Sequence, residues 1–422
     1  MQKDTIAIHA GYDKKEGFGT MSVPITQTTA YAFRDAEHAA NLFALKELGP
    51  IYTRLTNPTT DVLEQRYAQL EGGAAGICTA SGQAAIFYAI ANVAEAGDNI
   101  IISDKLYGGA ITLLTHTIKR FGIKAKVFKS ADASNLEEQI DENTKAIFFE
   151  SLSNPQIAIA DVEAIVKIAK KHGVLTICDN TVATAALFNP ISWGVDIVVH
   201  STSKYTNGQG TAVGGIVIER DGLAEFFKEN SKRYYHFCEP DESYHGLVYT
   251  DVPLPNFCLR IRLNLLRDIG ATQSPLNSWL LIQGLETLSI RVEKHSSTSL
   301  EVAKYLESNP KVKSVNYPGL KSNDNYEKAQ KYFKDGKASG LISFEVEDYD
   351  TAKAIIDKAK LFSVVVNIGD SKSLIVHPAS TTHSQLSEEG LKEAGVNPTT
   401  IRLSIGLEDS KDLIEDLEQA LS

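Results

Sequence analysis

Short apolar runs alternate with amphipathic stretches between Thr59 and Ile218. Apolar runs of strand length separated by helical spacing are typical of strands joined by crossover helices, so this pattern predicts an α/β fold with a largely parallel sheet. The strands are expected at residues 76–79, 99–102, 124–128, 146–149, 174–178, 196–199 and 214–218. The helices between them are expected at residues 82–94, 108–121, 135–140 and 161–172.

The two ends of the chain follow other patterns. Residues 1–58 are rich in Pro, Thr and Tyr and have little helical or strand period, and an arm of this kind usually packs on a neighbouring subunit. Residues 261–299 keep a helical period and predict one long helix that leads into a second unit. In that unit, strands are expected at 315–317, 341–346 and 374–376 and helices at 349–359 and 411–420. We therefore expect an arm (1–58), a large domain (59–260) with helices on both faces of its sheet, and a smaller C-terminal α+β domain (261–422).

Composition and charge exclude several classes of protein. The net charge of -11 is spread along all 422 residues, which opposes non-specific binding to nucleic acid. No apolar stretch approaches the ~18 residues that span a bilayer, and the first residues start no apolar leader, so no membrane partner is expected. The four cysteines lie far apart without a CxxC pair, which argues against a zinc site and for a reducing compartment. These features predict a cytoplasmic protein whose partners are small molecules and copies of itself.

Polar side chains follow the predicted strands at their carboxyl ends, where open α/β sheets bind ligands. The tripeptide 81–83 (Ser-Gly-Gln) opens a helix directly after the first strand. Asn154, Asp179 and Lys204 each come within a few residues of the end of a later strand. One pocket is thus expected to collect a carboxylate, an amide, several hydroxyls, a lysine and a helix N-terminus.

Each of these residues also has a purely structural explanation. A single lysine is usually a solvated surface residue, an aspartate often caps a helix, and Ser81 is equally well explained as an N-cap. Lys204 departs from that pattern because it follows an apolar strand and lies among small hydroxyl residues. Desolvation there would leave a neutral amine that can form a Schiff base. Asp179 beside a pyridine cofactor would keep the ring nitrogen protonated, and residues 81–83 would offer backbone N–H groups to a phosphate.

Other ligand motifs are absent from the sequence. There is no GxxxxGK[ST] segment, residues 208–210 (Gly-Gln-Gly) lack the third glycine of GxGxxG, and no GxSxG surrounds Ser81. A nicotinamide oxidoreductase is therefore disfavoured. His377 and His383 have no carboxylate or cysteine at ligand spacing, so a structural or substrate-orienting role is favoured over a metal site.

Several motifs in a fixed order resemble those of a known family over nearly the whole chain. They are residues 52–59 (YTRLTNPT), 81–85 (SGQAA), 106–109 (LYGG), 179–181 (DNT), 200–205 (HSTSKY) and 402–406 (RLSIG). With these motifs the chain resembles the fold-type I pyridoxal-phosphate (PLP) enzymes of cysteine and methionine metabolism. That family includes cystathionine synthases and lyases, methionine γ-lyase and O-acetylhomoserine sulfhydrylase.

The resemblance implies a role for each motif. Lys204 would carry the PLP, Asp179 would pair with the pyridine nitrogen, and Tyr107 would stack on the ring and help to move protons. The other implied cofactor contacts are Ser81, Gly82, Gln83, Asn154, Thr181, Ser201 and Ser203, with Tyr52 and Arg54 completing the phosphate site from a neighbouring subunit. Arg402, Asn367 and Tyr52 would bind the substrate, with the Arg402 guanidinium holding its α-carboxylate by two hydrogen bonds. The implied assembly is a homo-oligomer, usually a tetramer built from two dimers.

Some segments narrow the resemblance to one branch of the family. Those most like O-acetylhomoserine sulfhydrylase are residues 240–247, 283–288, 367–370 and 377–383. Gly109 stands where methionine γ-lyases tend to have cysteine, and Gln83 replaces a familiar methionine. The implied reaction replaces the acetate of O-acetyl-L-homoserine with sulfide or methanethiol, giving L-homocysteine or L-methionine. A methionine γ-lyase or a cystathionine γ-synthase or lyase is the alternative. A non-catalytic binding protein is a more remote one, and the joint presence of Lys204, Asp179, Arg54 and Arg402 opposes it.

Overall fold

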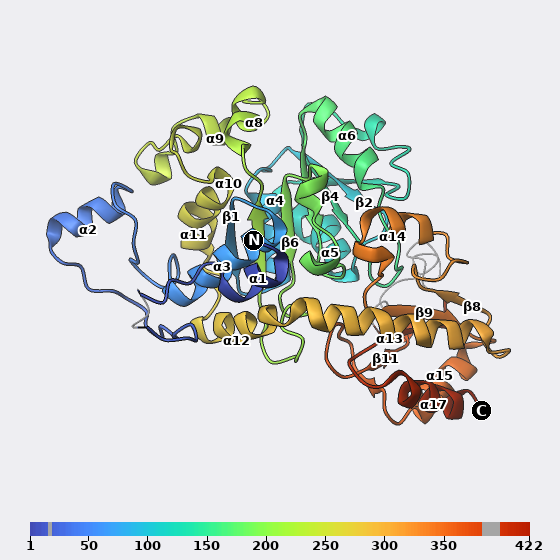
Figure 1. Cartoon of the computed structure of the whole chain (residues 1–422). Helices are drawn as coiled ribbons and strands as arrows, with labels where there is room; N and C mark the ends of the chain where they lie inside the picture. Colours follow the sequence, from blue (N-terminus) through green and yellow to red (C-terminus); the bar gives the residue numbers. More distant parts are fainter. Residues whose placement is uncertain (16–18, 382–396) are drawn as a thin grey trace.

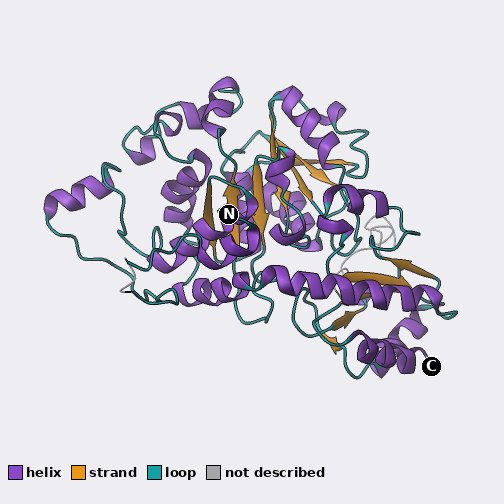
Figure 2. Cartoon of the chain, in the orientation of Figure 1, coloured by secondary structure: helices purple, strands orange, loops and turns teal. Residues whose placement is uncertain are grey.

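The computed structural model describes residues 1–15, 19–381 and 397–422 and contains two β-sheets with helices packed around them, as Figure 1 and Figure 2 show. The strands of the larger sheet are β1 (Ala75–Thr79), β2 (Asn99–Ser103), β3 (Lys124–Phe128), β4 (Thr144–Glu150), β5 (Leu175–Asp179), β6 (Ile197–His200) and β7 (Gly215–Glu219). Their order across the sheet is β1-β7-β6-β5-β4-β2-β3, and β7 runs antiparallel to both its neighbours while the other pairs are parallel. The predicted α/β class with a mostly parallel sheet is confirmed, and every predicted strand of this sheet lies within two residues of an observed one.

Helices cover both faces of this sheet. In β2, Ile100 and Ile102 point to one face and Ile101 to the other, because side chains alternate along a strand. The helices on the face of Ile101 are α3 (Pro58–Glu71), α6 (Val162–His172), α7 (Thr184–Leu187) and α12 (Pro275–Glu286). Those on the opposite face are α4 (Gly82–Ala91), α5 (Gly108–Thr112), α8 (Leu223–Glu229), α9 (Tyr235–Cys238) and α10 (Asn256–Arg260). Burial on both sides explains the nearly continuous apolar character of the strands.

Two predicted helices of the large domain have a different form. The segment 108–121 begins as α5, continues as the π-helix η1 (Leu113–Thr117) and the 3₁₀-helix η2 (Ile118–Phe121), and ends at Gly122 in the left-handed region. The segment 135–140 forms only the 3₁₀ turn η3 (Glu137–Gln139), because so short a stretch gains too few hydrogen bonds to offset helix nucleation.

The prediction of one helix over residues 261–299 was wrong. The π-helix η7 (Ile261–Leu266) and α11 (Arg267–Ile269) end at Gly270, whose φ of 82° a helix cannot continue. A new helix, α12, starts where the Ser274 side chain accepts a hydrogen bond from the Asn277 N–H and Pro275 takes the first position. The following α13 (Leu288–Ser308) does lead into the second sheet, as Figure 1 shows.

The smaller sheet has the strand order β10-β11-β12-β9-β8. Its strands are β8 (Ser314–Asn316), β9 (Leu341–Glu345), β10 (Ser363–Val364), β11 (Leu374–Val376) and β12 (Thr400–Ser404). Helices α13, α15 (Tyr349–Lys358) and α17 (Ser410–Leu421) share its core, and α14 (Tyr326–Tyr332) packs toward the larger sheet. The central strand β12, which contains Arg402, was not among the predicted strands, and β10 was not either.

The N-terminal segment contains helices that the sequence did not predict. The first, α1 (Lys3–His9), packs on α3 and α12 and buries Ala7 in the core of the large sheet. The second, α2 (Ala36–Phe43), stands away from the body of the molecule in Figure 1. The remaining short helices are η4 (Pro190–Trp193), η5 (Glu242–Tyr244), η6 (Tyr249–Asp251), η8 (Lys334–Gly336) and η9 (Pro378–Ser380). None of the helices in the described ranges has the length and apolar character needed to cross a membrane.

Candidate active site

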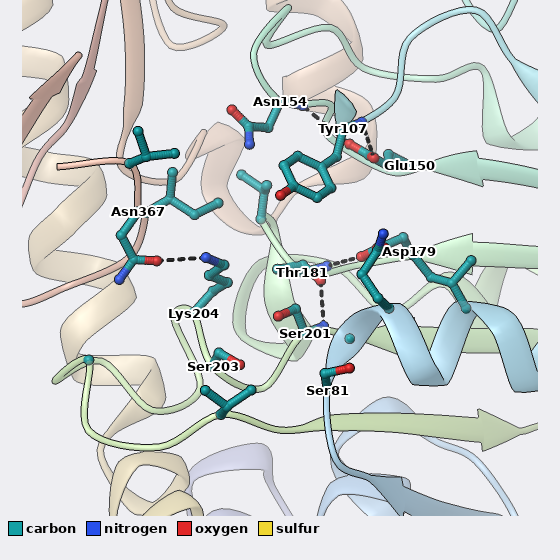
Figure 3. A pocket seen from close by; sticks show the side chains of 18 of the residues that line it. Ser81, Tyr107, Glu150, Asn154, Asp179, Thr181, Ser201, Ser203, Lys204 and Asn367 are labelled. Atoms are coloured by element: carbon teal, nitrogen blue, oxygen red, sulfur yellow. Dashed lines mark hydrogen bonds between the residues drawn. The ribbon is translucent and has the colours of Figure 1, made fainter. Parts of the chain in front are cut away.

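A cavity of about 360 Å³ lies at the carboxyl ends of β4, β5 and β6, beside the N-terminus of α4 (Figure 3). The predicted site residues that line it are Ser81, Gly82, Gln83, Tyr107, Asn154, Asp179, Thr181, Ser201, Ser203, Lys204, Asn367 and Arg402. The structure thus brings together side chains from five loops of the large sheet and from the smaller sheet.

Lys204 follows β6 and extends its amine into this cavity. Its Nζ atom donates a hydrogen bond to Oδ1 of Asn367 at 2.6 Å, as Figure 3 shows. Burial lowers the pKa of Lys204, and the charge of Arg402 lowers it further. A larger share of this amine is therefore neutral, and able to act as nucleophile or base, than for a lysine in water.

Asp179 is the last residue of β5 and faces the same cavity. Its Oδ1 atom accepts a hydrogen bond from the Thr181 N–H at 2.9 Å. Burial raises the pKa of Asp179, while the bonds from Thr181 and the charge of His200 act in the opposite direction. A buried carboxylate of this kind gains most from a cationic group placed beside it in the cavity.

The N-terminus of α4 and the loop after β6 approach closely at one end of the cavity. A Cβ atom on Gly82 would lie 2.5 Å from the Cβ of Ser201, so only glycine allows this approach. The Ser201 N–H donates to Thr181 Oγ1 at 2.8 Å, and the Ser81 hydroxyl accepts from the Ala84 N–H at 3.1 Å. Ser81 therefore caps the helix, and the hydroxyls and first N–H groups at this end suit a phosphate.

Arg402 reaches the other side of the cavity from β12. Its Nη1 donates to Asn154 Oδ1 at 2.9 Å and its Nη2 donates to the Asn367 carbonyl oxygen at 3.1 Å. The side chain is buried, and its Nε atom has no hydrogen-bond partner among the described residues. Burial lowers the pKa of Arg402 to about 10. A buried guanidinium with a spare donor is suited to a ligand carboxylate.

Tyr107 lies on the loop after β2 and directs its ring into the cavity (Figure 3). A Cβ atom on Gly109 would lie 2.5 Å from Cε1 of that ring, so the glycine lets the tyrosine lie across its own loop. The side-chain Nε2 of Gln83 donates to the Gly109 carbonyl oxygen at 2.9 Å and ties this loop to α4. Gln83 thus has a second role that its expected backbone contact did not include.

Sequence reasoning missed Glu150, a buried carboxylate that also lines the cavity. It is the last residue of β4 and is in register with Asp179 at the end of β5. Its position at a strand end was the available signal, because the same position singled out Asp179. The apolar wall was also missed; it includes Ile86, Leu152, Val182 and Ile368.

The remaining predicted residues do not line the cavity or lie outside the described residues. Tyr52 and Arg54 do not line the cavity; the Arg54 guanidinium instead lies 5.5 Å from the centroid of the Tyr52 ring. Their assignment to a neighbouring subunit's site stays a prediction. The His377 ring is bonded to the Ser380 hydroxyl and the Pro398 carbonyl oxygen, away from the cavity, which supports its structural role. His383 lies outside the described residues.

Comparisons with known proteins give one consistent result. A model of the family described as Cys/Met metabolism PLP-dependent enzyme matches residues 4–422. The chain is 45% identical to an O-acetyl-L-homoserine sulfhydrylase of Leptospira meyeri, over 99% of this chain and 96% of that one. It is 42% identical to a homocysteine synthase of Schizosaccharomyces pombe, over 99% and 97% of the two chains. A solved structure of a putative O-acetylhomoserine (thiol)-lyase from Campylobacter jejuni is 56% identical over the full length of both chains, with a TM-score of 0.97, and carries N'-pyridoxyl-lysine-5'-monophosphate at its position 205.

Proposed function

The chain belongs to the family of PLP-dependent enzymes of Cys/Met metabolism, and we propose that it transfers the aminocarboxypropyl group of O-acetyl-L-homoserine to sulfide. The products are L-homocysteine and acetate, with methanethiol as a second sulfur donor that would give L-methionine. The observation that carries this reaction is the full-length similarity to O-acetylhomoserine sulfhydrylases and homocysteine synthases. The fold is the fold-type I architecture of the family, with a mostly parallel large sheet and a separate smaller one.

The residues of the cavity fit PLP. The charge pattern supports this, because a buried carboxylate that needs a cation (Asp179) and an anion-binding helix end (Gly82) flank an amine of lowered pKa (Lys204). In the Campylobacter structure the pyridoxyl-lysine stands at position 205, one number from Lys204 here, and the two chains match over their full length. When bound, PLP supplies an aldehyde that links covalently to amines and a ring that withdraws electrons from the substrate Cα.

Lys204 is then the residue that holds the cofactor and moves the proton. Its neutral amine accepts the proton from the substrate Cα and can return it later, which is general acid–base catalysis by one group. Asp179, at the end of β5, would stabilise the positive charge of a bound ring. Tyr107 lines the same cavity, where it would cover a bound ring and could pass protons to the substrate.

Arg402 and its neighbours orient the substrate. The guanidinium binds the α-carboxylate, and Asn154 and the Asn367 carbonyl fix the angle at which it does so. The apolar wall around Ile368 excludes water from the reacting atoms.

The assembly and location belong to the same proposal. We propose a homo-oligomer, a tetramer of two dimers, in which Tyr52 and Arg54 of one subunit complete the phosphate site of another. Tyr52 is 41% exposed, which is consistent with a surface that meets a partner. We place the enzyme in the cytoplasm because all four cysteines are free in the structure.

One experiment tests the reaction. Purified protein reconstituted with PLP is incubated with O-acetyl-, O-succinyl- or O-phospho-L-homoserine, each with and without sulfide, and the amino acid formed is identified by mass. The expected product is homocysteine, formed with sulfide and the O-acetyl substrate. Parallel incubations contain methionine alone, or cysteine in place of sulfide. Release of thiol and 2-oxo acid from methionine, with no homocysteine formed from any acylated homoserine, would replace the proposal with a γ-lyase. Use of cysteine as the thiol would indicate a cystathionine γ-synthase.

A further inference from the structure

Glu150 occupies a position in the cavity wall that the proposed mechanism does not use. It ends β4, its Cα atom is paired in register with that of Asp179 on β5, and the residue is 6% exposed. Figure 3 shows it beside Tyr107. A carboxyl group is rarely buried this deeply unless donors surround it, so the contacts of its two oxygens indicate what it does.

Each oxygen of Glu150 holds a different loop. Oε1 accepts a hydrogen bond from the Tyr107 N–H at 2.6 Å, and Oε2 accepts one from the Asn154 N–H at 3.2 Å. Tyr107 lies on the loop after β2, whereas Asn154 lies on the loop after β4. A carboxylate can accept both bonds, but an amide in its place has one acceptor oxygen and would turn an N–H toward the other donor.

Asn154 in turn links Glu150 to Arg402 of the smaller sheet. The Asn154 side chain accepts the hydrogen bond of Arg402 Nη1, and Arg402 has no other side-chain partner among the described residues. The orientation of the guanidinium therefore depends on where the Asn154 backbone stands. A continuous set of contacts runs from Tyr107 through Glu150 and Asn154 to Arg402.

The position of the Tyr107 ring also depends on the Glu150 carboxylate. The residue is 45% exposed, so its ring gains little from packing and follows the backbone of its loop. That backbone is held by Glu150 at Tyr107 itself and by Gln83 at Gly109. Release of the first bond leaves the ring free to tilt away from the cavity.

The charge of Glu150 matches the proposed occupant of the cavity. Burial and the neighbouring Asp179 raise the pKa of Glu150 well above its ordinary range, while the two N–H donors act in the opposite direction. Two carboxyl groups side by side in a buried cavity wall favour a cation bound beside them in the cavity. A cationic cofactor ring meets this requirement.

We propose that Glu150 is a positioning residue that sets the places of Tyr107 and Arg402 together, so that the tyrosine lies on the cofactor while the arginine faces the substrate carboxylate. This inference rests on the function proposed above. In this view one buried side chain, Glu150, positions both the loop that carries Tyr107 and the arginine that binds the substrate.

The test compares three variants of the reconstituted enzyme with the wild type. Glu150→Gln keeps the shape but can accept only one of the two bonds, and Glu150→Asp keeps the charge but is too short to reach both loops. Glu219→Gln is the matched control, because Glu219 is an equally buried carboxyl at the end of β7, outside the cavity lining. Each variant is assayed for KM, kcat, PLP affinity and the visible circular dichroism of the bound cofactor.

Both Glu150 variants should raise the KM for O-acetyl-L-homoserine about tenfold, the loss of one hydrogen bond to a charged group, and lower kcat as well. The circular dichroism of bound PLP should change because the ring loses its fixed neighbour, while Glu219→Gln should retain the wild-type spectrum and KM. Wild-type kinetics and spectrum in both Glu150 variants, or equal changes in the control, would overturn the inference. The PLP spectrum and affinity report on Glu150 even if the wild type proves to use another substrate, so failure of this inference and failure of the proposed reaction are distinguishable.

Discussion

The amine of Lys204 and the amide of Asn367 are 2.6 Å apart, although 163 positions separate them in the chain. Lys204 lies on the loop after β6, and Asn367 lies between β10 and β11 of the smaller sheet. A second bond joins the same two loops, from the Ser371 N–H to the Gly208 carbonyl oxygen. The central amine is therefore held by a side chain from the smaller sheet, and the charge of Arg402, which the same sheet supplies, lowers its pKa.

Replacement Asn367→Asp should move the pH dependence of cofactor attachment. The pKa of Lys204 is lowered by burial and by Arg402, and a carboxylate at residue 367 would favour the ammonium form and raise that pKa. At a given pH less of the amine would then be neutral, so the acid limb of the rate should shift to higher pH, by about one unit. The measurement is the rate of the absorbance change when apo-protein is mixed with PLP at pH 6 to 10. Asn367→Ala is the control, because it removes the acceptor without adding charge. An acid limb that is unchanged in Asn367→Asp, or that moves to lower pH, would contradict the predicted rise in the pKa of Lys204.

The local part of this site could be predicted from the sequence. Asp179 ends a buried strand and Lys204 follows one within a few residues, and the carboxyl ends of neighbouring parallel strands must meet at one edge of the sheet. The strand positions followed from their apolar runs for the same reason. The local sequence pattern was therefore sufficient to predict the site residues that lie at strand ends.

The contacts between distant segments could not be predicted from residue pattern. Arg402 meets Asn154 only because β12 lies at the centre of the smaller sheet, and nothing in the local sequence fixes how the two sheets face each other. The place of Arg402 was expected from family resemblance alone. The break at Gly270, and the one at Thr287 between α12 and α13, were missed because the helical period continues across them. A single left-handed residue or a helix cap nevertheless ends a helix.

Replacement Arg402→Lys should weaken the binding of the amino-acid substrate. Lysine keeps a positive charge but loses the fork that bonds Asn154 and the Asn367 carbonyl while it faces a carboxylate. Loss of one charge-assisted bond predicts a rise in KM of about 10- to 100-fold. Steady-state kinetics with O-acetyl-L-homoserine measure this, and the exposed Arg120→Lys serves as control. An unchanged KM would remove Arg402 from the substrate site.

Combining two impaired variants in one dimer should restore activity if each site is built from two subunits. Lys204→Ala should abolish turnover and borohydride-trappable PLP, and Arg54→Ala should weaken the phosphate site. In a hybrid dimer, one site would carry both changes and the other neither, so the purified hybrid should recover about half of the wild-type activity. Co-expression of the two variants with different tags, followed by assay of the doubly purified hybrid, measures this. No recovery in the hybrid would show that Arg54 serves its own subunit or no site.

Glu219 should make the stability of the apo-protein fall as pH rises. Burial raises the pKa of this carboxyl from 4.5 to about 7, against the hydrogen bonds from Cys258, Phe257 and Asn256. A group whose pKa is higher in the folded state stabilises the fold fully below its unfolded pKa, and this contribution is lost as pH rises to the folded value. The loss between pH 4.5 and 7 is about 3 kcal/mol. Glu219→Gln does not titrate, so its unfolding midpoint in urea should rise relative to wild type between pH 5 and 8, whereas the exposed Glu229→Gln should follow the wild type. A constant difference between the Glu219 variant and the wild type across this range would mean that the carboxyl is ionised throughout.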